Sequence, residues 1–279
     1  MSGTIYIVGT PIGNLSDFSP RAIETLKRVD FIAAEDTRVT LKLLNHFDIV
    51  KPLVSYHEHN LRQRGEVIIG RVLAGENAAI VSDAGMPCVS DPGEDLVRLA
   101  AEAGIPTVVI PGPSAAISAL CISGLPTSRF AFEGFLSTNR KNRREHLLSV
   151  QNDTHTLIFY EAPHKLLDTL RDMAAVLGEG RRVSLCREMT KIHEEVFRTT
   201  LGEAAAYYAE NTPKGEFVLI IEGAKPALPP EMPLEEAVEE AARLVAEGMR
   251  PTDAAKQVSA HTRFRKSEIY AALMAKPEA

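Results

Sequence analysis

The first part of the chain alternates short β-branched runs with amphipathic stretches. The runs predict strands at residues 4–8, 31–34, 53–56, 78–82 and 107–110. The stretches between them predict helices at residues 20–28, 40–46, 62–73 and 94–103. Strands that alternate with helices are typical of a mostly parallel sheet joined by crossover helices.

The second part follows a different pattern, in which the closing strands have less helix between them. Strands are predicted at residues 130–135, 156–160, 182–186, 196–200 and 216–221, and helices at 164–177 and 203–211. This pattern indicates an α+β or mixed sheet. The join is expected at residues 123–128, where Gly124, Pro126 and Thr127 interrupt the periodicity.

A small third part follows the Pro-rich stretch 225–230. Helices are predicted at residues 234–247, 252–260 and 266–274, with Thr252 and Ser267 as N-caps. This tail resembles a helix-turn-helix, and a helical lid or dimer contact is an equal alternative. We therefore predict an α/β protein with a parallel-sheet N-terminal domain (1–123), a mixed-sheet second domain (124–224) and a helical piece (231–279).

Composition adds limits to this picture. Hydrophobic residues make up 45% of the 279 residues, which is enough for a buried core. Proline and glycine interrupt the most apolar region, 105–125, so a membrane helix is not expected there. No basic region followed by an apolar run opens the sequence, which predicts a cytoplasmic protein without a signal peptide.

Cysteine spacing and charge exclude further classes. Cys88, Cys121 and Cys186 form no CxxC pair, so we expect reduced thiols rather than a disulfide or zinc framework. The net charge of −6 argues against a protein coated in nucleic acid, although a local basic patch is compatible with it.

Gly/Pro-rich loops follow three of the predicted strands, at residues 9–15, 83–93 and 111–115. Because the carboxyl ends of parallel strands share one edge, these loops are expected to converge on one ligand crevice. Glycine allows close backbone approach to a ligand, and Asp83 and Asp91 can bind hydroxyls or offset a positive charge. The phosphate-binding GxxxxGK[ST] and GxGxxG motifs are missing, which disfavours P-loop and Rossmann nucleotide sites.

These three loops resemble those of the tetrapyrrole methylase superfamily. The motif at residues 83–93 is the specific one, although Cys88 and Val89 stand where other small or branched residues are more usual. The stretches 34–38, 55–60, 159–164 and 214–217 narrow the resemblance to members that methylate a cytidine 2′-hydroxyl in 16S rRNA. The resemblance runs from about residue 4 to residue 222 and continues into the tail.

The resemblance implies that S-adenosylmethionine binds in a cleft between two α/β domains, usually in a homodimer. It implies a cytidine in the decoding region of the small ribosomal subunit as the acceptor. The cofactor-binding residues carried over by motif are Pro11, Asp83, Ala84, Gly85, Ser90, Pro113, Ser114, Ala115, Tyr160, Leu185 and Gly215. A simple N-cap is the alternative role of Ser114.

Methyl transfer from a sulfonium requires the protein mainly to position the two reactants, because the cofactor itself carries the electrophile. A ribose hydroxyl is a poor nucleophile, so a base or a cation near it would help. The candidates, left unranked, are Glu35, Asp36, Arg38, Glu161, Arg187, Glu188 and Lys214. Each has a structural ion pair as its alternative role. His57 and His59 lack a third ligand at a supportive spacing, so no metal is expected.

Two basic clusters are candidates for contacts to RNA phosphates. Arg140, Lys141, Arg143 and Arg144 are expected on a mobile loop, and Arg263 and Arg265 flank an aromatic residue in the tail. A solvated surface is the alternative for both clusters. Three rival functions stay open: methylation of a tetrapyrrole precursor, methylation of a protein such as elongation factor two, and ribosome binding without catalysis.

Overall fold

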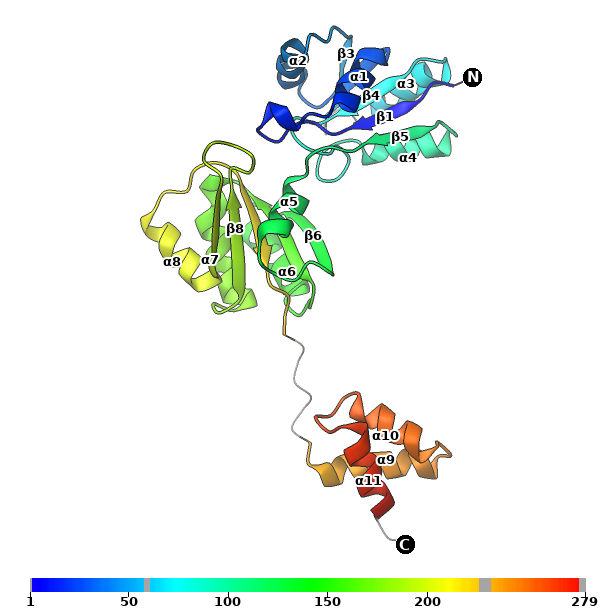
Figure 1. Cartoon of the computed structure of the whole chain (residues 1–279), viewed down its shortest axis with the longest axis vertical. Helices are drawn as coiled ribbons and strands as arrows, with labels where there is room; N and C mark the ends of the chain where they lie inside the picture. The colour runs from blue at the N-terminus through cyan, green and yellow to red at the C-terminus, as the bar shows by residue number, and fades with distance from the viewer. Residues whose placement is uncertain (1, 58–60, 226–231, 276–279) are drawn as a thin grey trace. The chain divides into compact units, whose positions relative to one another are not determined.

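The computed structural model describes residues 2–57, 61–225 and 232–275, apart from the side chains of residues 61 and 62. The chain forms two compact units, Met1–Ala224 and Lys225–Ala279, which are described separately. The first unit contains two β-sheets, drawn blue to cyan and green to yellow in Figure 1.

The first sheet is parallel throughout, as predicted, with the strand order β3-β2-β4-β1-β5. Its strands are β1 (Ile5–Val8), β2 (Phe31–Ala34), β3 (Leu53–Ser55), β4 (Ala78–Val81) and β5 (Thr107–Ile110). The helices α1 (Pro20–Arg28), α2 (Thr37–His46), α3 (Leu61–Leu73) and α4 (Glu94–Glu102) connect them. Residues of α1 and α2 pack in one apolar core and residues of α3 and α4 in another, so both faces are covered.

Helix α2 begins three residues earlier than predicted, because Asp36 caps it. The Asp36 carboxylate accepts a hydrogen bond from the backbone N–H of Arg38 at 2.8 Å. This satisfies one of the amide groups that the first helical turn leaves without a partner.

The second sheet is mixed, also as predicted, with the order β6-β7-β10-β8-β9. Its strands are β6 (Phe130–Phe135), β7 (Thr156–Glu161), β8 (Arg182–Arg187), β9 (Glu195–Thr200) and β10 (Phe217–Ile221), and only the β6–β7 pair among them is parallel. Helices α7 (Leu166–Leu177) and α8 (Leu201–Glu210) share a core with one face, and α5 (Ala115–Ile122) packs on the other.

The predicted mobile loop at residues 140–144 is wrong, because these residues begin helix α6 (Arg140–Ser149). The side chain of Asn139 caps this helix by accepting from the N–H groups of Lys141 and Asn142. Arg143 anchors it, since its side chain is 9% exposed and its guanidinium lies 2.6 Å from the Asp172 carboxylate. A charged sequence therefore forms a fixed helix with one inward-facing cation.

The second unit consists of α9 (Leu234–Ala246), α10 (Pro251–Ser259) and α11 (Lys266–Ala275), and its three predicted helices are confirmed. They enclose a core of small and branched residues that includes Ala241, Val258 and Ile269. The predicted caps are wrong, because Thr252 and Ser267 lie inside α10 and α11. The Pro-rich stretch 225–230 lies outside the described residues except for residue 225.

None of the helices in the described ranges combines the length and apolar character needed to cross a bilayer.

Candidate active site

The loops after β1, β4 and β5 are tied together by backbone contacts. Thr10 and Gly85 exchange two hydrogen bonds, of 2.9 and 3.1 Å. The backbones of Gly9 and Gly112 touch so closely that a Cβ on Gly112 would lie 2.9 Å from Gly9 Cα. The predicted convergence of these loops is therefore confirmed, and two glycines make it sterically feasible.

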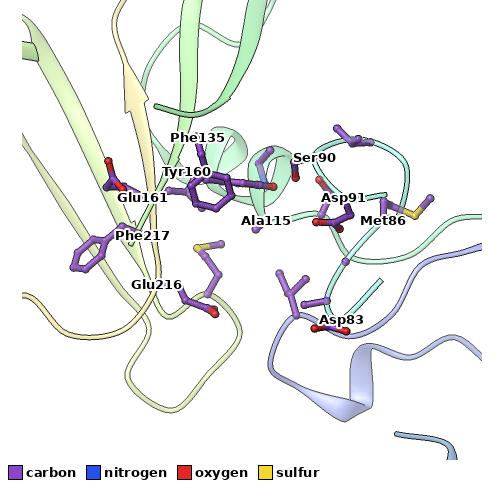
Figure 2. A pocket seen from close by; sticks show the side chains of 18 of the residues that line it. Asp83, Met86, Ser90, Asp91, Ala115, Phe135, Tyr160, Glu161, Glu216 and Phe217 are labelled. Carbon is purple, nitrogen blue, oxygen red and sulfur yellow. The ribbon is translucent and has the colours of Figure 1, made fainter. Parts of the chain in front are cut away.

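A cavity of about 530 Å³ opens where these loops meet the second sheet (Figure 2). This size is typical of pockets for small molecules and cofactors. The loops after the first sheet supply three acidic side chains, Glu35, Asp83 and Asp91, and the second sheet supplies two more, Glu161 and Glu216. The second sheet supplies apolar and aromatic ones, among them Phe135 and Tyr160.

The structure brings most of the predicted cofactor residues into this cavity. Those that line it are Asp83, Ala84, Gly85, Ser90, Ser114, Ala115 and Tyr160. Four others do not line it. Pro11 and Pro113 lie in the adjoining loops, and Gly215 precedes the lining residue Glu216. Leu185 is 1% exposed in the core shared with α7 and α8, because its side chain is on the opposite face of the sheet from α5.

Several lining residues were missed in the sequence, namely Ile12, Met86, Val89, Ala116, Phe135, Met189, Glu216, Phe217 and Val218. Met86 and Val89 lie within the 83–93 motif, so the predicted cofactor residues beside them could have indicated that they line the cavity too. Met189 had no such signal, since it lies between Glu188 and Thr190, which both adopt positive φ angles of 52° and 66°. Such backbone is rare for these residue types and is not predictable from local sequence.

Ser114 occupies the N-cap position of α5 but makes no side-chain capping hydrogen bond. Its predicted alternative role as a plain cap is therefore wrong. The N–H of Ala116 in the same turn donates to the Tyr160 hydroxyl at 3.2 Å. This bond links α5 to the second sheet at the wall of the cavity.

Three carboxylates lie together on the first-sheet side of the cavity. Burial raises the pKa of Glu35, Asp83 and Asp91, and repulsion from neighbouring carboxylates adds to each shift. In contrast, hydrogen bonds from Arg38 lower the pKa of Asp36 to about 2. Crowded, partly desolvated carboxylates are electrostatically suited to a cationic ligand.

Of the catalytic candidates, Glu35 and Glu161 line the cavity. Both oxygens of Glu161 are engaged, one by the N–H of Ala162 at 2.9 Å and the other by the Thr169 hydroxyl at 2.6 Å. In Figure 2 this side chain points away from the acidic loops. Glu161 therefore fixes the end of β7, which leaves Glu35 as the catalytic candidate whose carboxylate lines the cavity.

The remaining candidates lie outside the cavity lining and most form ion pairs. Asp36 binds Arg38 at 2.6 Å, Arg187 binds Glu195 at 2.8 Å, and Glu188 binds Lys191 at 2.9 Å. Lys214 is exposed, and its carbonyl accepts a 3.5 Å hydrogen bond from Arg187.

The ionisation of Glu35 is expected to make the protein's stability depend on pH. Because its folded pKa is raised, the stability that it contributes is complete below its ordinary value of 4.5 and is lost as the pH rises through the folded value. Glu35→Gln should therefore gain stability relative to the wild type as the pH rises above the ordinary value of 4.5 and through the raised folded pKa. Urea unfolding of both proteins measures this difference, and a difference independent of pH would contradict it.

The cations of α6 are expected to differ sharply in their effect on stability. Arg143→Ala leaves the Asp172 carboxylate, 14% exposed, with only Arg140 at 3.5 Å. Loss of such a pair costs about 2–3 kcal/mol of unfolding free energy. This cost does not exceed the lower end of the range for fully buried pairs. Arg144→Ala, at an exposed neighbouring position, should change it by less than about 0.5 kcal/mol. Equal effects in chemical denaturation would show that the Arg143 pair is not an anchor.

Within the described ranges, no group of three or more His, Cys, Asp or Glu side chains is arranged to hold a metal ion. His59 of the His57/His59 pair lies outside those ranges. Cys88, Cys121 and Cys186 are free thiols, as predicted, and burial raises the pKa of Cys88 to about 12.

The fold and the cavity define a class of methylases. The family model for Tetrapyrrole (Corrin/Porphyrin) Methylases matches residues 4–205. The structure of uroporphyrin-III-C-methyltransferase from Thermus thermophilus has the same fold, with a TM-score of 0.56 at 19% identity, over 78% of this chain and 94% of that one.

Relatives of higher sequence identity define a narrower group within this class of methylases. This chain is 49% identical to a ribosomal RNA small subunit methyltransferase I of Synechocystis, over 96% of each chain. It is 51% identical to the one of Halalkalibacterium halodurans, over 96% of this chain and 93% of the relative. The chain belongs to the tetrapyrrole methylase family and, within it, to the ribosomal RNA small subunit methyltransferase I group.

Proposed function

We propose that this protein transfers a methyl group from S-adenosylmethionine to the 2′-hydroxyl of a cytidine in 16S rRNA, in the decoding region of the small ribosomal subunit. The observation that carries the proposal is the identity of 49–51% to small-subunit rRNA methyltransferases over nearly the whole chain. We further propose that it acts in the cytoplasm as a homodimer, as the family resemblance implies.

The residues of the cavity fit this cofactor. The carboxylates of Asp83 and Asp91 complement a sulfonium cation, and Ser114 presents a hydroxyl that is not used as a helix cap. Gly85, at φ +85°, lets the loop backbone face the cavity without a side chain in between. When bound, the cofactor supplies an activated methyl group, so the protein's task is to position the acceptor oxygen and accept its proton.

Glu35 is the group that we assign to the proton of the ribose hydroxyl. It lines the cavity, and burial together with Asp91 and Asp83 raises its pKa. A raised pKa makes a carboxylate a stronger base, which suits proton removal from a weak acid.

The test is transfer of labelled methyl groups from S-adenosylmethionine to small ribosomal subunits from cells that lack this protein, with naked rRNA in parallel. We expect label at one cytidine 2′-oxygen, and much less of it with Glu35→Gln. Cofactor binding without label in either RNA would contradict the proposal and favour a ribosome-binding role. Label in a tetrapyrrole precursor or a protein, with none in RNA, would favour the corresponding rival enzyme.

The exposed cations of the two basic clusters are proposed to contact RNA phosphates. In α6 these are Arg140, Lys141 and Arg144, and in the tail Arg263 and Arg265. Arg143 does not belong to this set, because it is buried against Asp172.

A further inference from the structure

Phe135 is an apolar side chain that lines the cavity and is nevertheless 57% exposed. Its ring meets the Tyr160 ring at 61°, with 5.4 Å between the centroids, and both rings lie at the second-sheet wall (Figure 2). The Tyr160 hydroxyl accepts the hydrogen bond from Ala116, so Tyr160 is fixed. Phe135 therefore offers a supported aromatic surface to whatever enters this side of the cavity.

A β-bulge gives Phe135 this position. Phe132 pairs with Ile158 and Gly134 with Phe159, so Glu133 is an extra residue in β6, and Gly134 takes a φ of +66°. In a regular strand, residues three apart point to opposite faces. Here Phe132 and Phe135 both contact the Tyr160 ring, at 5.1 and 5.4 Å. The bulge thus turns the side chain of Phe135 towards the cavity, a common function of bulges next to active sites.

Phe135 lines a cavity with several carboxylates and is followed along the chain by the basic first turn of α6. The cavity holds Glu35, Asp83 and Asp91, whose field repels phosphates. Helix α6 begins five residues after Phe135 along the chain, a span of at most about 18 Å. The side chains of its first two residues, Arg140 and Lys141, are 81% and 82% exposed. Anchoring of Arg143 on Asp172 holds this turn in place. The phosphates that flank a nucleotide at Phe135 are therefore within reach of these cations.

We infer that Phe135 is the stacking platform for the base of the nucleotide whose ribose is methylated, with Arg140 and Lys141 on the flanking phosphates. The inference rests on the proposed function and names the part of the cavity that takes RNA. Flat aromatic side chains recognise unpaired bases in single-stranded RNA by stacking. The part of the cavity lined by Asp83 and Asp91 is left for the cationic cofactor.

The experiment compares Phe135→Leu and Phe135→Trp in the full-length protein. Phe130→Leu is the matched control, since Phe130 is on the same strand, 43% exposed, and outside the cavity lining. Four quantities are measured: KM and kcat with small subunits, the Kd of S-adenosylmethionine by calorimetry, and the fluorescence of a short single-stranded RNA that carries a fluorescent cytosine analogue. Stacking on an aromatic ring quenches such an analogue.

For Phe135→Leu we expect KM for the subunit to rise about 10-fold or more, the range of base–aromatic stacking. The cofactor Kd should stay within about 2-fold, and quenching of the analogue should be lost. Phe135→Trp should retain the wild-type KM and the quenching of the analogue. Phe130→Leu should match the wild type. An equal loss of cofactor affinity would overturn the inference and assign Phe135 to the cofactor. Unchanged KM and quenching would also overturn it. Failure of the proposed function itself would be seen separately, as a wild type that labels no RNA.

Discussion

Replacing Gly112 with alanine is expected to lower the free energy of unfolding by about 2–3 kcal/mol, the upper range for overpacking, and to abolish cofactor binding. The added Cβ would lie 2.9 Å from both the carbonyl carbon and Cα of Gly9, and 3.0 Å from its oxygen. These are backbone atoms, so no rotamer change relieves the contact. The loops after β1 and β5 must separate, and with them two walls of the site.

Chemical denaturation and calorimetric titration with S-adenosylmethionine check this result. Gly70→Ala is the control, because a Cβ at Gly70 in α3 meets nothing within 4 Å. In the interior of a helix this change should stabilise the protein by about 0.5–1 kcal/mol. A Gly112→Ala protein with wild-type stability and cofactor affinity would show that the contact between the two loops is not needed.

The second large effect is expected from the acidic side of the cavity. Asp91→Asn keeps the shape of the side chain and removes its negative charge. A unit charge roughly 5 Å away at an effective dielectric constant of roughly 40 contributes about 1.7 kcal/mol, so affinity for S-adenosylmethionine should fall about 15-fold. S-adenosylhomocysteine, whose sulfur is neutral, should lose much less. The loss of affinity for S-adenosylmethionine is expected because Asp91 belongs to a group of neighbouring carboxylates. Asp83 of this group lies close enough to raise the pKa of Asp91.

Calorimetric Kd values for the two ligands, with wild type and variant, give the comparison. Glu102→Gln is a suitable control, because it removes an exposed carboxylate at the far end of α4, which pairs with Arg98. If Asp91→Asn weakens both ligands equally, the carboxylate binds a part that they share rather than the sulfonium. If it weakens neither, the acidic loops do not serve the cofactor.

Elements governed by local pattern could be predicted from the sequence. The parallel sheet followed from short buried apolar runs such as β4, and its loops were expected at one edge because strand direction fixes that edge. Helix α6 could not be found this way. Its sequence is dominated by charge, and it depends on Asp172, which lies 29 residues from Arg143 along the chain.

The same distinction separates the site residues that could be predicted from those that could not. Asp83, Gly85, Ser90 and Ser114 lie in loops whose composition singles them out, and the cavity includes them. The second-sheet wall was largely missed, because strand periodicity does not reveal which face of β6, β8 or β10 meets a partner. Leu185 was expected in the pocket and lies in the core, whereas Phe135 reaches the cavity because one extra residue shifts the register.

Helix α5 has a consequence for how such proteins can be recombined. It continues directly from the loop after β5, yet Ala116, Ala119 and Leu120 pack against Ile158 and Val218 of the second sheet. A break at residue 123, the boundary suggested by the sequence, would leave an uncovered apolar helix on one fragment and an uncovered apolar sheet face on the other. A chimera of two relatives should therefore cross over before Ser114, so that α5 is inherited together with the sheet on which it packs.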